Sequence, residues 1–166
     1  AYEEMLEMAS LGAKVLQTRS VEMAMKYGVR VQVLSSFEEK EGSLLVDEEE
    51  VVERRLVTGV TYSRNEAHIT LTKVPNTPGL AADIFAPLTE KDINVDMIVQ
   101  NTLGDGKTDF TFTVHRDDYL QAKALLEIVC TELDAEAVQG NNEIAKVSIV
   151  GVGMWNHPGV AKTMFE

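Results

Sequence analysis

The sequence has a single cysteine, Cys130, and only 15 basic residues against 27 acidic ones. One cysteine excludes an intrachain disulfide and fits a reducing cytoplasm. It lies in an apolar pattern, which is typical of a small buried side chain rather than a nucleophile. The net charge of −12 repels phosphate backbones and anionic lipids. We therefore expect a cytoplasmic protein without nucleic-acid or membrane partners.

Long hydrophobic runs are also lacking. The longest apolar stretches, such as 147–152, have the length of a strand and are too short to span a bilayer. The first residues include Glu3 and Glu4 instead of a basic region followed by an apolar one, so we expect no secretory signal. The composition, 45% hydrophobic and 25% charged, is ordinary for a globular protein.

The first 46 residues alternate between helix and strand patterns. Ser20 is a candidate N-cap, and Gly28 is expected to end the helix that follows it. Two helices and two strands form too small a core for a domain, so we interpret this segment as the tail of a larger one. Residues 47–55 are rich in charge and predict a solvated connector. The expected elements are helices at 2–11 and 20–27 and strands at 29–34 and 42–46.

A regular pattern begins near Leu56 and predicts an α+β domain. Its order is β-α-β-β-α-β, the ferredoxin-like arrangement, in which two helices cover one face of a four-stranded antiparallel sheet. Pro87 falls inside the first helix and predicts a kink or an early end there. The expected elements are strands at 56–62 and 68–74, a helix at 80–88, strands at 93–99 and 109–114, a helix at 117–133 and a strand at 135–139.

An internal repeat links two parts of the chain. Residues 78–85 recur 80 residues later as 158–165, with proline, glycine, alanine and phenylalanine at identical positions, and each copy follows a strand. This period fits two copies of one small domain. The second copy stops at Glu166, so either the sequence is a fragment or residues 56–62 and a partner chain supply the missing part.

The Pro-Gly pair in each copy stands at a strand-to-helix turn. Glycine lets a ligand approach the first amides of the helix, and these amides and the helix dipole favour a carboxylate. The carboxylate of an α-amino acid would suit such a position. The alternative is that Pro-Gly only makes a tight turn.

Patterns typical of enzymes are missing. The three histidines, His68, His115 and His157, are too far apart in the sequence to suggest a metal site. The glycines at 151 and 153 do not have the spacing of a dinucleotide-binding loop. The sequence also lacks a lysine- and glycine-rich motif that could hold the phosphates of a nucleotide. We therefore expect neither a catalytic site nor a metal site.

Several motifs in a fixed order resemble the regulatory region of aspartate kinases, which has tandem ACT domains and also occurs as a separate regulatory (beta) subunit. Pro78-Gly79-x-Ala81 followed by 93–101 looks like the first ACT domain, and 108–113 is similar to its next strand. Residues 146–154 and 157–160 resemble the start of a second ACT domain. Residues 12–16, 19–21 and 35–37 resemble the end of an amino-acid kinase domain.

The resemblance implies a division of the chain and a regulatory role. The implied parts are the kinase-domain tail at 1–46, a connector and strand at 47–66, ACT domain 1 at 67–140 and a truncated ACT domain 2 at 144–166. The parent enzyme converts ATP and L-aspartate to 4-phospho-L-aspartate, the first step of lysine, threonine and methionine biosynthesis. This chain would bind lysine, threonine or both for feedback inhibition, as a homodimer through its ACT domains and together with the kinase catalytic domain or subunit.

The same resemblance implies a set of effector-binding residues and no cofactor in this chain, since ATP and Mg belong to the catalytic part of the parent. Many members have aspartate where this chain has Asn76, which removes one charge from a candidate ammonium partner. A dimerisation module without sensing and a free-standing enzyme are the alternatives. The implied effector residues are Asn76, Pro78, Gly79, Ala81, Asn94, Val95, Asp96, Gln100, Val160 and Ala161.

Overall fold

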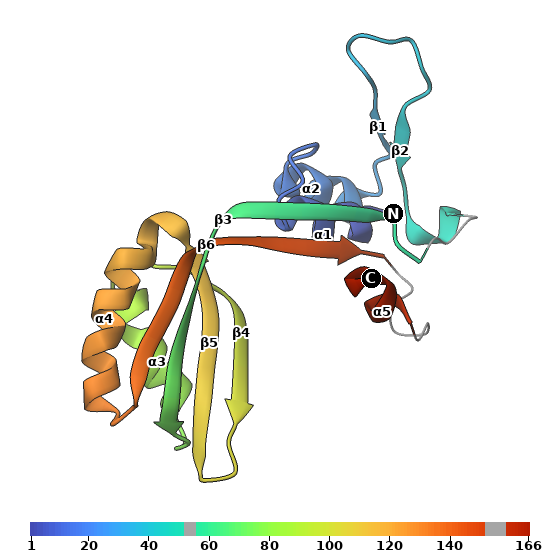
Figure 1. The fold of residues 1–166 in the computed structure, drawn as a ribbon. Coiled ribbons are helices and arrows are strands. Elements are labelled where there is room, and N and C mark those ends of the chain that lie inside the picture. Colours follow the sequence, from blue (N-terminus) through green and yellow to red (C-terminus); the bar gives the residue numbers. More distant parts are fainter. Residues whose placement is uncertain (52–55, 152–158) are drawn as a thin grey trace. The chain divides into compact units, whose positions relative to one another are not determined.

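The computed structural model describes residues 1–51, 56–151 and 159–166 and shows two compact units (Figure 1). Unit 1 contains residues 1–63 and 147–166, and unit 2 contains residues 64–146. Each unit has its own hydrophobic core. The expectations for His157 and for Pro158 of the second repeat lie outside the described residues.

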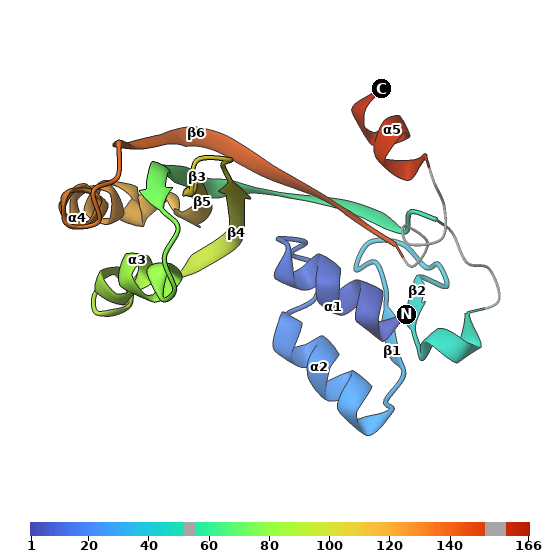
Figure 2. The same ribbon diagram turned by 90° about the horizontal axis from the view of Figure 1, so that it is seen from below.

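Unit 2 contains the four-stranded sheet, in the order β4-β5-β3-β6. Helices α3 and α4 lie on the same face of this sheet (Figures 1 and 2). The ferredoxin-like α+β fold predicted from the sequence is therefore confirmed. The elements are β3 (Gly59–Pro75), α3 (Leu80–Thr89), β4 (Val95–Thr102), β5 (Lys107–His115), the 3-10 turn η2 (Arg116–Asp118), α4 (Tyr119–Glu132) and β6 (Ala137–Val150).

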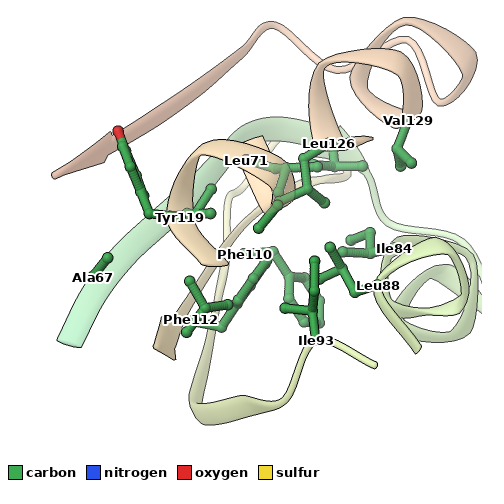
Figure 3. Packing of buried hydrophobic residues seen from close by; sticks show 14 of the residues in the cluster. Ala67, Leu71, Ile84, Leu88, Ile93, Phe110, Phe112, Tyr119, Leu126 and Val129 are labelled. Carbon is green, nitrogen blue, oxygen red and sulfur yellow. The ribbon is translucent and has the colours of Figure 1, made fainter. Parts of the chain in front are cut away.

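Alternation along the strands explains why this face is buried. Ala67, Ile69 and Leu71 on β3 are fully buried, and the residues between them are not. On β5, Phe110 and Phe112 point the same way and meet Leu126 of α4 and Ile84 of α3 in one cluster (Figure 3). Apolar residues at helical spacing on α3 and α4 thus cover apolar residues at strand spacing on the sheet.

Unit 1 is built around two short helices and a two-stranded hairpin. Helix α2 begins at Thr18, and its N-cap is Gln17, whose carbonyl accepts hydrogen bonds from Ser20 and Val21. The predicted N-cap at Ser20 is wrong because Ser20 already lies inside the first turn, whereas the predicted end at Gly28 is confirmed. The elements are α1 (Tyr2–Ser10), α2 (Thr18–Tyr27), β1 (Val31–Val33), β2 (Ser43–Leu45), η1 (Glu48–Glu50) and α5 (Val160–Phe165), with the ends of β3 and β6.

Two strands are longer than the sequence predicted. Most of the expected strands at 56–62 and 68–74 falls in one strand, β3, and most of the strand expected at 135–139 falls in β6, together with the strand that precedes the second copy of the repeat. Gly140 lies inside β6, and the groups around it explain why glycine is present there. A Cβ on Gly140 would stand 2.8 Å from the His68 carbonyl oxygen and 2.9 Å from the Tyr119 ring. Glycine permits this close approach between strand and helix.

Helix α3 continues past Pro87 to Thr89, so the early end expected at this proline is wrong. Proline removes one backbone hydrogen bond, which would otherwise reach the carbonyl of Asp83. Asp83 is exposed, so water can hydrate that carbonyl. Burial of Leu88, one residue beyond the proline, favours completing the last turn.

Replacing Gly140 by alanine should destabilise the chain. The added methyl group would overlap a backbone carbonyl that cannot move away cheaply, and such overpacking costs about 1–3 kcal/mol. Urea denaturation followed by circular dichroism would measure the difference in unfolding free energy.

Gly104→Ala is the matched control because a Cβ there would meet nothing within 4 Å. Its effect should stay within about 0.5 kcal/mol. Equal stability of the two variants would contradict the close packing described for Gly140.

Candidate functional site

The turn between β3 and α3 brings the first group of sequence-predicted residues together. Gly79 is the N-cap of α3 and has a φ of 92°, a left-handed conformation that side chains other than glycine rarely adopt. Its carbonyl accepts hydrogen bonds from the amides of Ala82 (2.9 Å) and Asp83 (3.2 Å). Asn76 is tied to the β4–β5 turn through its amide, which donates to the Gly106 carbonyl at 3.0 Å.

A cavity of about 220 Å³ lies at this turn. The side-chain amide of Gln100, on β4, donates a hydrogen bond to Oδ1 of Asn76 at 3.4 Å across it. Both side chains are exposed and none of the described lining residues is charged. Pro78 is exposed in the turn beside the cavity. The lining residues are Asn76, Thr77, Gly79, Leu80, Ala81, Ala82, Gln100 and Phe110.

Asn94 and Val95 lie elsewhere, at the opposite end of β4 from Gln100. They line a second cavity, of about 410 Å³, where α3 ends and β4 begins. Its other lining residues are Phe85, Thr89, Asp92 and Ile93. The structure therefore separates two groups that the sequence placed in one set.

Asp96 lies in neither cavity lining and is part of an ion-pair cluster. Its carboxylate pairs with the ammonium of Lys146, which also lies 3.4 Å from Oε1 of Glu66. The hydrogen bond from Lys146, together with one from the Met97 amide, holds the pKa of Asp96 below its usual value. Burial opposes the charged form of Lys146, yet the bond to Asp96 and the charge of Glu66 raise its pKa above the usual value.

The second copy of the repeat starts a helix in the same way as the first. Gly159 has a φ of 111° and is the N-cap of α5, and its carbonyl accepts a hydrogen bond from Thr163 at 3.0 Å. Val160 lines a mostly apolar cavity of about 450 Å³ within unit 1, while Ala161 is exposed. The lining of this cavity is Leu56, Val57, Ile149, Gly159, Val160, Thr163 and Met164.

Sequence reasoning missed two residues, one in the cavity beside Asn76 and one in the ion-pair cluster of Asp96. Phe110 lines the cavity of about 220 Å³ beside Asn76, which we call the Asn76 cavity. The alternation of apolar residues along β5 could have placed Phe110 on the face of the sheet that α3 covers. Lys146 gave no local signal, because its partner Asp96 is 50 residues away in the chain.

The described part of the chain contains neither a candidate metal site nor a helix that could span a membrane. Within residues 1–51, 56–151 and 159–166, no group of three His, Cys, Asp or Glu side chains is placed to hold a metal ion. No helix among the same residues has the length and apolar character needed to cross a membrane. Burial raises the pKa of the Cys130 thiol, which disfavours the reactive thiolate.

Comparison with known proteins identifies the family. Residues 68–132 match the ACT domain. The chain is 55% identical, over 166 residues, to an aspartate kinase of Pseudomonas putida, and this match covers 99% of the chain but 40% of the relative. The chain thus spans about 40% of the length of that curated relative.

Two solved structures extend this comparison. The regulatory subunit of aspartate kinase from Thermus thermophilus, in a ligand-free form, is 41% identical with a TM-score of 0.60, covering 67% of this chain and 73% of that one. Aspartokinase III of E. coli, in complex with lysine and aspartate, is 25% identical with a TM-score of 0.61, covering 90% and 33%. This chain belongs to the aspartate kinase family and represents its regulatory region, with an ACT domain.

Proposed function

We propose that this chain binds lysine, threonine or both and thereby mediates feedback inhibition of an aspartate kinase. The observation that carries the proposal is the cavity at the start of α3, where Asn76 and Gln100 face the first turn of a helix. The E. coli relative is described in complex with lysine and aspartate, which supports an amino acid as the ligand.

The two ends of the cavity suit the two charges of an α-amino acid. The Ala81 amide in the first turn of the ten-residue helix α3 and the positive end of the helix dipole would receive the α-carboxylate, while the Leu80 and Ala82 amides donate to carbonyls within the chain. The carbonyl oxygens of the Asn76 and Gln100 side chains can accept hydrogen bonds from an ammonium or from a hydroxyl. Since these oxygens are neutral, the contacts are weaker than those from a carboxylate.

Assembly with other chains is part of the proposal. Strand β4 is at an edge of the sheet, and Met97, Ile98 and Val99 on it are about half exposed. An edge strand with exposed apolar side chains is a template for pairing with another chain. This supports a homodimer through ACT domains, in which Asn94, Val95, Asp96, Val160 and Ala161 would contribute to effector binding from positions outside the Asn76 cavity.

The catalytic part of the enzyme would be a separate domain or subunit of the cytoplasmic enzyme. It would hold ATP and Mg and phosphorylate L-aspartate, while residues 1–46 represent the tail of the kinase domain. Effector binding at the ACT domains would shift the kinase toward an inhibited state, with a coupling free energy of about 1–3 kcal/mol.

Binding should be visible as thermal stabilisation of the chain. A ligand at 100 times its Kd stabilises the folded state by about 2.7 kcal/mol, so L-lysine or L-threonine at saturating concentration should raise Tm by several degrees. Differential scanning calorimetry would measure the shift.

The D-enantiomers of the same amino acids serve as controls, because they change ionic strength and net charge equally. No shift with either L-amino acid would reject the sensing function. If light scattering then still showed a stable dimer, the alternative of a dimerisation module without sensing would replace it.

Replacing Asn76 by aspartate should strengthen the binding of L-lysine. A charge-assisted hydrogen bond contributes about 1 kcal/mol more than a neutral one, which corresponds to about fivefold in Kd. Isothermal titration calorimetry at neutral pH would measure the change.

Asn142→Asp is the matched control, since Asn142 is exposed on β6 and outside the described cavity linings. It adds the same charge and should change the Kd by less than about twofold. An equal gain in both variants would mean that net charge, and not a contact at position 76, sets the affinity.

A further inference from the structure

Strand β4 contains a bulge that changes which face its later residues occupy. Before the bulge, Val95 pairs with Val114 and Asp96 with Thr113, while after it Val99 pairs with Thr111 and Gln100 with Phe110. The register therefore shifts by one residue between Asp96 and Val99. One extra residue on β4, at Met97–Ile98, is accommodated without a partner on β5.

This shift decides where Gln100 points. Val114, Phe112 and Phe110 all lie on the buried face of β5, so Val95 and Gln100, which pair with Val114 and Phe110, occupy that same face. In a regular strand, residues five apart lie on opposite faces. Without the extra residue, Gln100 would point to the face opposite α3 and away from Asn76.

Asp96 holds the bulge in place. Met97 has a φ of 38°, in the left-handed region that residues other than glycine seldom adopt, and its amide donates to Oδ1 of Asp96 at 2.9 Å. The register shift of β3 also has a residue with positive φ whose amide donates to an aspartate, but that aspartate lies on the opposite strand, β5. There Lys73 has a φ of 51° and its amide donates to Oδ1 of Asp109 at 2.8 Å.

Lys146 fixes the orientation of the Asp96 carboxylate. The Asp96 side chain is 64% exposed, whereas those of Lys146 and Glu66 are 12% and 13% exposed. The Lys146 ammonium is therefore held on β6 beside β3 and binds the carboxylate from a nearly buried position. An exposed carboxylate left alone would sample several rotamers.

We propose that Asp96, held by Lys146, is a positioning residue that fixes the bulge of β4 and so turns Gln100 toward Asn76 and the start of α3. Asp96 then acts on the ligand through Gln100 and not by direct contact. The ligand-binding part of this inference rests on the proposed function, whereas the register of β4 does not.

The test compares five variants of the whole chain, Asp96→Ala, Asp96→Asn, Lys146→Met, Gln100→Ala and the double variant Asp96→Ala with Gln100→Ala. Glu132→Ala is the control, since it removes one exposed carboxylate on α4. Calorimetry gives the Kd for L-lysine and L-threonine. Nuclear Overhauser contacts between Gln100 and Phe110 report the register of β4 in the absence of ligand.

Asp96→Ala should weaken the binding of the amino acid by about threefold to tenfold, as expected for losing a hydrogen-bonding group. It should also remove the Gln100–Phe110 contacts. In the Gln100→Ala background the same change should have little further effect, because Asp96 acts through Gln100. Asp96→Asn keeps an acceptor for the Met97 amide, so it should lose less affinity than Asp96→Ala. Lys146→Met leaves that acceptor in place and should also weaken binding less than Asp96→Ala does.

The inference would be overturned if Asp96→Ala kept both the Gln100–Phe110 contacts and the affinity of the unmodified chain. It would also be overturned if the fold-increase in Kd of the double variant equalled the product of the increases in the two single variants. If Asp96→Ala does not fold, Asp96→Asn and Lys146→Met decide by the same two measurements. If the unmodified chain binds neither amino acid, the proposed function fails, and the Gln100–Phe110 contacts alone then decide the role of Asp96.

Discussion

Burial of one face of the unit 2 sheet under α3 and α4 is the constraint on which its other features depend. Phe112, Ile69 and Leu71 have no exposed surface, and burying each such side chain stabilises the fold by about 1.5–3 kcal/mol. The Phe85 ring meets Phe112 edge-on, with centroids 5.1 Å apart. Since side chains alternate along a strand, this packing also assigns every neighbouring residue to the opposite face, where Thr70 and Thr111 are hydrogen-bonded at 2.9 Å.

Much of this fold could be predicted from local sequence patterns. Local patterns predicted the helices α3 and α4 and the strands of unit 2 in their order, because helical and strand periodicity are encoded within a few neighbouring positions. The bulge at Met97 could not be predicted in this way, because alternation gives no signal for one extra residue and Lys146, the ion-pair partner of Asp96, is 50 positions away in the chain. The close packing at Gly140 could not be predicted either, because the groups that require glycine there belong to His68 and Tyr119.

The candidate site shows a similar limit. Asn76, Gly79 and Ala81 are close in sequence, so their meeting at one turn followed from local chemistry. Asn94 and Gln100 came from resemblance to a family, which gives positions without distances. Six residues of extended chain separate them by about 20 Å, so one small ligand cannot touch both side chains within a single copy of unit 2.

The uncharged lining of the Asn76 cavity has an evolutionary consequence. Asn76 and Gln100 are exposed and lie outside the buried cluster that stabilises unit 2. A change of side chain at either position can alter the charge offered to a ligand at little expense to folding. Under the sensing function that we propose, ligand preference and thermodynamic stability are thus separable traits, and selection can change the first by single substitutions while the scaffold stays the same.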